Sequence, residues 1–597
     1  MSEYYAPLRD MQFVLKELAG LDAVAQLPGC EEATPDLVDA VLEEAARFAL
    51  EVLSPLNYPG DQEGATWHDK AVTMPAGFKE AYKLFVESGW AALASEPEWG
   101  GQGLPKVVAA AVGEMWKSAN HAFSLCPLLT TGAIEALVLS GSEELKKTYL
   151  EKMVSGEWTG TMNLTEPNAG SDLAAVRTRA EPQPDGSYKI YGQKIFITYG
   201  DHDMVENIVH LVLARTPNAP EGVKGISLFV VPKFLVNADG SLGARNDAWC
   251  VSIEHKLGIH ASPTAVMAFG DHSGAIGHLV GEENRGLEYM FIMMNAARFG
   301  VGLEGVAVCE RAYQRARDYA RERIQCTDIG VRGGPKVPII AHPDVRRMLM
   351  TMKAYAEATR ALAYVVAAAH DAAMRHPDEG ERKANQAFVD LMIPVVKGWS
   401  TETGVMVASL GVQVHGGMGY VEETGAAQHL RDAQISTIYE GTTGIQANDL
   451  IGRKIARESG STLKVVIEAM RALDADLAQQ AGGHFVAIRN RLRTGVDALA
   501  ATGGWLVATY GSDVRAAAAG AVPFLKLLGT VAGGWLMARA ALAAQARIAA
   551  GDSDPFFVAK IGTARFYADH ILSQAPGLAS TVTDGAEGVM ALPEDMF

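Results

Sequence analysis

In an early and a late region of the chain, the apolar residues recur with the spacing of amphipathic helices. Near the start, apolar positions recur at intervals of three and four in residues 37–45 and 78–86, which predicts helices. The same spacing returns after about residue 283, in residues 305–325 and 395–410. A further helix is predicted to begin at His342-Pro343-Asp344, where the proline occupies a tolerated first-turn position, and to continue past Ala369.

Between these segments the pattern changes to short β-rich runs. They are separated by turn clusters such as Pro184-Asp185-Gly186-Ser187, and they lie at 188–191, 194–198, 208–213 and 227–231. No helix-length segment separates them, so we expect antiparallel pairing. The predicted fold is mostly α with a central small antiparallel β domain and a C-terminal helical extension. The predicted domains are residues 1–157, 158–282, 283–455 and 456–597.

Composition excludes several classes of protein. Hydrophobic residues make up 48% of the 597 residues and charged residues 20%, as in globular proteins with a large core. The net charge of −18 disfavours a nucleic-acid binder, which needs a basic face. The alanine-rich residues 456–597 have helical spacing, so we expect a packed bundle there.

Cysteine usage and hydropathy indicate a soluble protein. The five cysteines are scattered without a CxxC pair, which signals neither a zinc site nor a disulfide framework. The first twenty residues carry acids and no apolar signal core. Pro523 and Lys526 interrupt the most apolar stretch, at residues 516–537, so no membrane span is expected. We therefore expect a cytoplasmic protein.

Glu440 is the candidate for acid–base chemistry. It lies in the stretch Thr437-Ile-Tyr-Glu-Gly-Thr-Thr-Gly-Ile-Gln446, between a β-branched and aromatic run and a loop of small residues. A purely structural interpretation is a helix start, in which Thr443 and Gln446 form a capping box and Glu440 is favoured by the helix dipole. These ten residues alone favour the structural interpretation.

Three other stretches have equally ordinary interpretations when taken singly. Residues 162–172, MNLTEPNAGSD, are rich in turn formers. Residues 196–198, FIT, are ordinary strand material, and residues 413–419, QVHGGMG, suit a tight connection. Together with the Glu440 stretch, in this order and on this helix–β–helix background, they resemble the acyl-CoA dehydrogenase family. The resemblance covers roughly residues 35–455. The long C-terminal block resembles the extended subgroup with 3-methylmercaptopropionyl-CoA dehydrogenases and some bacterial fatty acyl-CoA dehydrogenases.

The resemblance implies an FAD-dependent α,β-dehydrogenation of an acyl-CoA thioester to the 2-enoyl-CoA. Glu440 matches the family's catalytic base, and Gly441 would let the thioester approach closely. A few family members place the base on an earlier helix, but the matching residue here is Ala297, which accepts no proton. Implied substrate-side residues are Ser171, Asn295, Arg298, Tyr439 and Gly441. Implied FAD-binding residues are Met162, Leu164, Thr165, Ser171, Phe196, Thr198, Arg323, Gln413, Gly416, Gly417, Thr442 and Gly444.

The sequence departs from the family pattern at three places. Phe196 stands where many members have tryptophan, which keeps a stacking ring and loses an indole N–H. The common Arg-Lys-Thr-Phe-Gly is replaced by Arg323-Ile-Gln-Cys-Thr327, followed by an insertion around residues 330–335. Gly444 replaces a frequent glutamine. None of these changes removes the predicted base.

The resemblance leaves the electron acceptor and the assembly open. An electron-transfer flavoprotein or a similar acceptor is implied, whereas an acyl-CoA oxidase would use the same base and pass electrons to oxygen. A nitroalkane oxidase relative would carry aspartate at position 440. A non-enzymatic nucleic-acid-binding relative is disfavoured by the acidic balance. Shorter members are commonly tetramers; because residues 456–597 are expected to cover apolar helix faces, we predict a homodimer here.

Overall fold

The β-rich runs form one eight-stranded sheet in the computed structural model, which describes residues 4–597. The strands follow the order β10-β11-β5-β12-β7-β6-β3, and β4 pairs with β5. The long strand β5 pairs with β12 and β4 through its first half and with β11 through its second. The strands are β3 (Trp158–Asn163), β4 (Arg179–Pro182), β5 (Tyr188–Thr198), β6 (Asn207–Ala214), β7 (Ser227–Pro232), β10 (Ala248–Ile253), β11 (Thr264–Phe269) and β12 (Ala275–Val280).

The sequence led us to expect a wholly antiparallel sheet, but one pair of strands is parallel. Strands β3 and β6 run parallel, with Trp158 opposite Asn207 and Asn163 opposite Val212. The expectation rested on the absence of a helical crossover between the runs. The chain instead makes the crossover through β4 and β5, which belong to the other part of the same sheet. The remaining pairings of the sheet are antiparallel.

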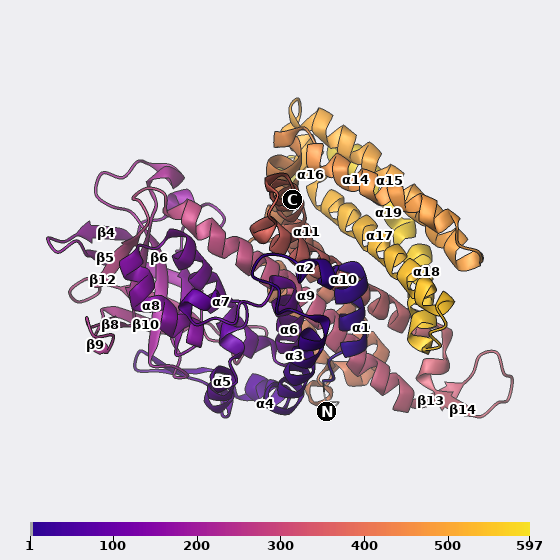
Figure 1. The fold of residues 1–597 in the computed structure, drawn as a ribbon, viewed down its shortest axis with the longest axis horizontal. Helices are drawn as coiled ribbons and strands as arrows, with labels where there is room; N and C mark the ends of the chain where they lie inside the picture. Colours follow the sequence, from indigo (N-terminus) through magenta and orange to yellow (C-terminus); the bar gives the residue numbers. More distant parts are fainter. Residues whose placement is uncertain (1–3) are drawn as a thin grey trace. The chain divides into compact units, whose positions relative to one another are not determined.

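The sheet belongs to a unit formed by residues 47–104 and 119–300, here called the β unit (Figure 1). Helices α7 (His121–Ser140) and α8 (Glu143–Ser155) pack against β3, and each begins with a side-chain cap. The side chains of Asn120 and Ser142 accept hydrogen bonds from the Phe123 and Leu145 amides. The other elements of this unit are α4 (Ser54–Glu63), β1 (Thr66–His68), β2 (Ala71–Thr73), α5 (Phe78–Glu87), β8 (Phe234–Val236), β9 (Leu242–Arg245) and the first part of α9 (Gly286–Glu322).

The second unit, here called the helical unit, comprises residues 4–46, 105–118 and 301–597. Its longest helices are α10 (Pro343–Arg375) and α11 (Glu379–His415). Helix α10 begins at the predicted residue, whereas α11 is longer than the predicted 395–410. The other elements are α1 (Leu8–Phe13), α2 (Leu21–Val24), α3 (Pro35–Phe48, mostly here), α6 (Lys106–Ala119), the later part of α9, β13 (Ile324–Thr327), β14 (Lys336–Pro338), α12 (Ala426–Gln434) and α13 (Thr443–Asp449).

Residues 456–597 form helices that pack onto this bundle. Helix α17 contacts α10, α11 and α13, and α18 contacts α10. Two glycines permit the close approach of α17, because a Cβ at Gly529 or Gly533 would lie 2.3 or 2.8 Å from an atom of Trp399 on α11. The helices are α14 (Ser461–Ala478), α15 (Gly483–Tyr510), α16 (Val514–Ala519), α17 (Ala521–Ala549), α18 (Pro555–His570), α19 (Ala575–Asp584) and α20 (Ala586–Val589).

Three helices are long and apolar enough to cross a membrane by length and composition alone: His121–Ser140, Gly286–Glu322 and Ala521–Ala549. In their most apolar windows, 67%, 67% and 78% of the residues are buried inside the protein. Their apolar side chains therefore largely serve the core. The absence of a membrane span stays a prediction.

A buried ion cluster joins α18 to the bundle. Lys560 contacts Asp10 and lies 2.8 Å from Glu357 Oε2. Arg360 contacts Asp10 at 2.6 Å and Glu114 at 2.6 Å. Burial would raise the pKa of Asp10, but the charges of Lys560 and Arg360 outweigh burial and lower that pKa to about 2. Asp10 is thus ionised at neutral pH.

Lys560→Met is expected to lower the free energy of unfolding of the helical unit by roughly 1–3 kcal/mol, because it removes one of the two cationic partners of the buried carboxylates of Asp10 and Glu357. Urea denaturation followed by circular dichroism measures the change. Lys526→Met, at an exposed lysine of the neighbouring helix α17, is the matched control and should change stability by no more than about 0.5 kcal/mol. Equal denaturation midpoints for the two variants would contradict a stabilising role for Lys560.

Candidate active site

Glu440 lies in a short loop between a 3₁₀ turn (Ile435–Thr437) and helix α13. Its side chain is half-buried, and its backbone φ is +58°, followed by +93° at Gly441. A left-handed conformation is unfavourable for a non-glycine residue and persists only where surrounding contacts impose it. Such residues cluster at active sites, so this conformation favours a functional role for Glu440.

The cap of α13 differs from the prediction by one residue. Thr442 is the N-cap, and its hydroxyl accepts a weak hydrogen bond from the Ile445 amide at 3.4 Å. Thr443, the predicted cap, donates its hydroxyl to Glu402 Oε1 at 2.5 Å. The Gln446 side chain bonds carbonyl groups rather than a free N–H. The capping-box spacing selected Thr443 because Gln446 follows it by three residues, whereas Thr443 is the first residue of the helix itself.

Two buried side chains hold the loop from inside the helical unit. Lys397, on α11, is fully buried, and its Nζ donates to the Gly441 carbonyl at 2.8 Å. Gln446, on α13, is also fully buried. Its Nε2 donates to the carbonyls of Glu440 at 3.0 Å and Gly441 at 3.3 Å. The loop conformation therefore depends on contacts to two different helices.

Tyr439 is fixed by a third contact. Its hydroxyl donates to the Glu304 carboxylate on α9, 2.6 Å from Oε2. Burial, the Glu304 carboxylate and the charge of Glu440 raise the pKa of Tyr439 well above its ordinary value. The phenol therefore stays protonated and acts as a donor. Its predicted role beside the substrate remains a prediction.

The FIT stretch and the TEPNAGSD turn come together in the β unit. The Ile195 amide donates to the Thr165 carbonyl at 2.9 Å, and Lys194 Nζ donates to the Leu164 carbonyl at 2.9 Å. Met162 lies in β3, while Phe196 and Thr198 lie at the end of β5. Five of the residues predicted to contact FAD thus lie on adjacent backbone segments.

Phe196 is unusual in both conformation and exposure. Its φ is +60°, and 59% of its side chain is exposed although its neighbour Ile197 is buried. An exposed aromatic ring at the end of a strand suits stacking on a planar aromatic group. Phe196, with half-buried Thr198 two residues later, therefore fits the flavin of FAD.

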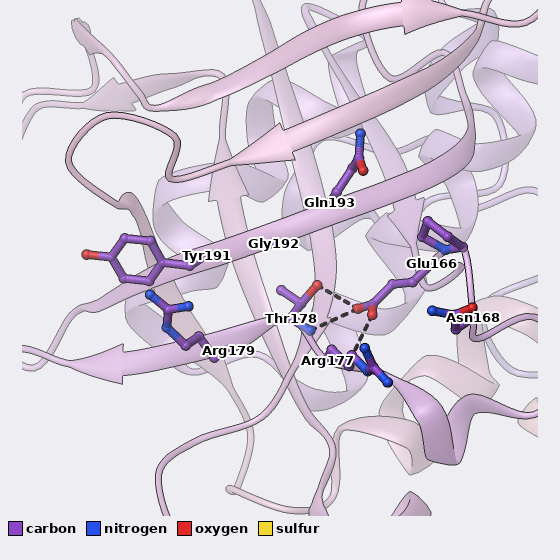
Figure 2. A pocket seen from close by; sticks show the side chains of 9 residues that line it. Glu166, Asn168, Arg177, Thr178, Arg179, Tyr191, Gly192 and Gln193 are labelled. Carbon is purple, nitrogen blue, oxygen red and sulfur yellow. Dashed lines mark hydrogen bonds between the residues drawn. The ribbon is translucent and has the colours of Figure 1, made fainter.

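Sequence reasoning missed the buried pair of Glu166 and Lys194, which supports this region. Lys194 Nζ lies 2.8 Å from Glu166 Oε1. The same carboxylate accepts the Arg177 amide at 2.7 Å and the Thr178 hydroxyl at 2.6 Å (Figure 2). Burial lowers the pKa of Lys194 to about 8 despite Glu166. Burial would raise the pKa of Glu166, but Lys194 and the hydrogen bonds lower it. Glu166 is thus ionised and fully engaged, so it is a poor candidate base.

A shallow cavity of about 240 Å³ lies beside this turn. Figure 2 shows Arg179 next to Tyr191, with the guanidinium 4.4 Å from the ring centre. The lining contains none of the predicted site residues and consists of Glu166, Pro167, Asn168, Arg177, Thr178, Arg179, Tyr191, Gly192 and Gln193.

The remaining predicted residues occupy separate positions. In the β unit, Ser171 is exposed on the turn and Asn295 is exposed on α9, whereas Arg298 is buried and Ala297 is apolar and buried. In the helical unit, Gln413 belongs to the last turn of α11 rather than to a loop. Arg323, Gly416, Gly417 and Thr442 are exposed, and Gly444 is half-buried in the first turn of α13.

Models of known protein families match most of the chain. The N-terminal, middle and C-terminal domain models of acyl-CoA dehydrogenase match residues 37–157, 161–271 and 284–455. The chain belongs to the acyl-CoA dehydrogenase family. A fourth model, described as acetyl-CoA dehydrogenase C-terminal like, matches residues 465–593.

Similar proteins extend over the whole length of this acyl-CoA dehydrogenase. The 3-methylmercaptopropionyl-CoA dehydrogenase of Ruegeria pomeroyi is 51% identical over 98% of this chain and 99% of its own. The broad-specificity linear acyl-CoA dehydrogenase FadE5 of Mycobacterium tuberculosis is 36% identical over the full length of both. The structure of acyl-CoA dehydrogenase complexed with FAD from Bacillus anthracis has a TM-score of 0.74 at 21% identity, covering 98% of this chain and 93% of that chain.

These relationships confirm the predicted family, the fold class and the class of reaction, FAD-dependent dehydrogenation of an acyl-CoA. They do not single out individual site residues, so the assignments to Glu440 and to the FAD contacts remain predictions that stand on the geometry above.

Proposed function

We propose that this enzyme dehydrogenates a short acyl-CoA, with 3-methylmercaptopropionyl-CoA as its first candidate substrate, and that Glu440 is the base. The observation that supports Glu440 is its left-handed backbone, held by Lys397 and Gln446. The substrate is suggested by the 51% identical relative that carries this substrate in its name and matches nearly the whole chain.

The reaction removes a proton and a hydride from neighbouring carbons. The α C–H of a thioester is a weak acid, so Glu440 must meet it in a prealigned site that excludes water. The carboxylate takes the α proton, and the electron pair of that bond forms the new double bond. When bound, FAD accepts the hydride that leaves the β carbon. Glycine at position 441 suits the φ of +93° and the close approach of Gln446, whose Nε2 would lie 2.8 Å from an added Cβ.

The residues proposed to contact FAD are given for each unit by itself. In the β unit they are the Leu164–Thr165 segment, Phe196 and Thr198. Lys194 holds this segment by donating a hydrogen bond to the Leu164 carbonyl. Phe196 offers a ring face, and Thr198 offers a hydroxyl. In the helical unit the proposed contacts are Arg323, Gln413, Gly416, Gly417, Thr442 and Gly444.

The proposal includes the electron acceptor and the setting of the enzyme. An electron-transfer flavoprotein or a similar acceptor fits a dehydrogenase of this family, and an oxidase would instead produce hydrogen peroxide in air. We further propose a homodimer in the cytoplasm. Peroxide measurements without an added acceptor distinguish oxidase from dehydrogenase, and fractionation of cells tests the location.

Anaerobic titration with a panel of acyl-CoAs tests the substrate. We expect 3-methylmercaptopropionyl-CoA to bleach the flavin absorbance with kcat/KM at least about 10-fold above palmitoyl-CoA, because each methylene mismatch in an apolar pocket is worth roughly 10- to 200-fold. Pentanoyl-CoA is the matched control, since a methylene replaces the sulfur at equal chain length. Faster bleaching by palmitoyl-CoA would overturn the proposed preference for a short acyl-CoA. A lack of bleaching by every acyl-CoA of the panel would overturn the proposed dehydrogenase function.

A further inference from the structure

Burial of the Lys397 side chain is energetically unfavourable in itself. It lies on α11 with a fully buried side chain, between Val396 and Gly398, which are also buried. Removing an ammonium from water is unfavourable unless hydrogen bonds and charges compensate. The Nζ donates to the Gly441 carbonyl at 2.8 Å, within normal hydrogen-bond distance. This buried Nζ therefore contacts the residue next to the proposed base.

The contacts of Lys397 and Gln446 determine how the loop is oriented. The carbonyls of Glu440 and Gly441 both accept hydrogen bonds from these buried side chains. The peptide groups are planar and trans, so fixing these two carbonyls fixes the peptide planes on both sides of Gly441. Glu440, with a φ of +58°, comes directly before these two planes. The Cα from which its side chain leaves the backbone is therefore anchored on its C-terminal side through its own carbonyl.

We propose that Lys397 is a positioning residue for the reaction, which holds the Gly441 carbonyl so that Glu440 keeps the left-handed conformation and its side chain the direction needed to meet the α proton. Gln446 assists by bonding the same carbonyl and that of Glu440. The inference rests on the proposed role of Glu440 as base. Lys397 itself makes no contact with substrate in this scheme.

Lys397→Met keeps most of the side-chain volume and removes the donor. The limiting rate of anaerobic flavin bleaching by 3-methylmercaptopropionyl-CoA, or by the best substrate of the panel, is expected to fall about 10- to 100-fold, because small displacements of a reacting group have effects of this size. The substrate concentration for half-maximal rate should change by less than about threefold, since binding is unaltered. FAD content should stay stoichiometric.

Lys560→Met is the matched control, since it also replaces a buried lysine of the helical unit by methionine. Its expected effect is on stability, with the bleaching rate within about twofold of wild type. A purely structural role for Lys397 would make the two variants alike in rate. Wild-type bleaching by Lys397→Met, or slowing no greater than in Lys560→Met, would overturn the proposal.

Gln446→Met supplies a second variant should Lys397→Met fail to fold. It should slow bleaching in the same way, and the double variant should be slower by less than the product of the two single effects, because both side chains hold one carbonyl. Unchanged bleaching in Gln446→Met would count against the proposal. Glu440→Gln, measured in parallel, separates the two levels of inference. If Glu440→Gln bleaches near the wild-type rate, Glu440 is not the base. If Glu440→Gln loses activity while Lys397→Met and Gln446→Met bleach at the wild-type rate, only the positioning role is overturned.

Discussion

Glu440→Gln is expected to slow anaerobic flavin bleaching by roughly 100- to 10,000-fold, the usual effect of losing a general base. The amide has nearly the shape of the carboxylate, but it cannot accept the α proton. The backbone contacts of residue 440 involve its carbonyl, so the fold and the FAD content should be unchanged. Stopped-flow absorbance with excess acyl-CoA measures the rate.

Glu402→Gln is the matched control for this variant. Glu402 is exposed on α11 and accepts the Thr443 hydroxyl close to the same loop. A glutamine oxygen still accepts that hydrogen bond, so bleaching should stay within about twofold of wild type. A Glu440→Gln enzyme that bleaches as fast as this control would end the assignment of Glu440 as base.

The sequence pointed to Glu440 but not to the side chains that hold it. The YEG context and its order relative to the other motifs led to Glu440. Lys397 follows a short apolar run, Ile393-Pro-Val-Val396, and a lysine in such a place usually extends its head to solvent. Its acceptor lies 44 residues later in the chain. A contact of this kind depends on how α11 packs against the loop, which periodicity cannot reveal.

The same limit explains the errors in the fold. The fold class and the start of α10 were predicted correctly because local signals determine them. Pro343 at the beginning of α10 is one such signal. The parallel pairing of β3 with β6 and the choice of Thr442 over Thr443 as cap depend on tertiary contacts. Glu166 and Lys194, 28 residues apart, meet only because β5 lies beside the turn after β3.

The packing of the C-terminal helices is expected to affect the oligomeric state of the protein. Helix α17 places Gly529 and Gly533 against Trp399, and Lys560 belongs to the buried ion cluster. The helices after Lys454 are therefore part of the helical unit and cover faces of α10 and α11. A chain that covers these faces itself does not need a second dimer to do so. This packing supports the proposed homodimer.

Light scattering coupled to size exclusion tests the proposed homodimer. The full chain is expected to elute with twice the mass of one chain, and four times that mass would reject the idea that the C-terminal helices replace a tetramer contact.

Truncation after Lys454 is expected to convert the proposed homodimer into aggregates or higher assemblies. It would expose Trp399, which is buried in the full chain, together with apolar residues of α10, and exposed patches of this kind drive association. It would also leave Asp10 and Glu357 without the Lys560 ammonium. Removal of residues 590–597 alone is the matched control. That segment is exposed, with Phe597 at 90%, so its loss should leave mass and thermal stability unchanged. A chain truncated after Lys454 that stays a stable dimer with wild-type unfolding temperature would show that the helices are an independent module.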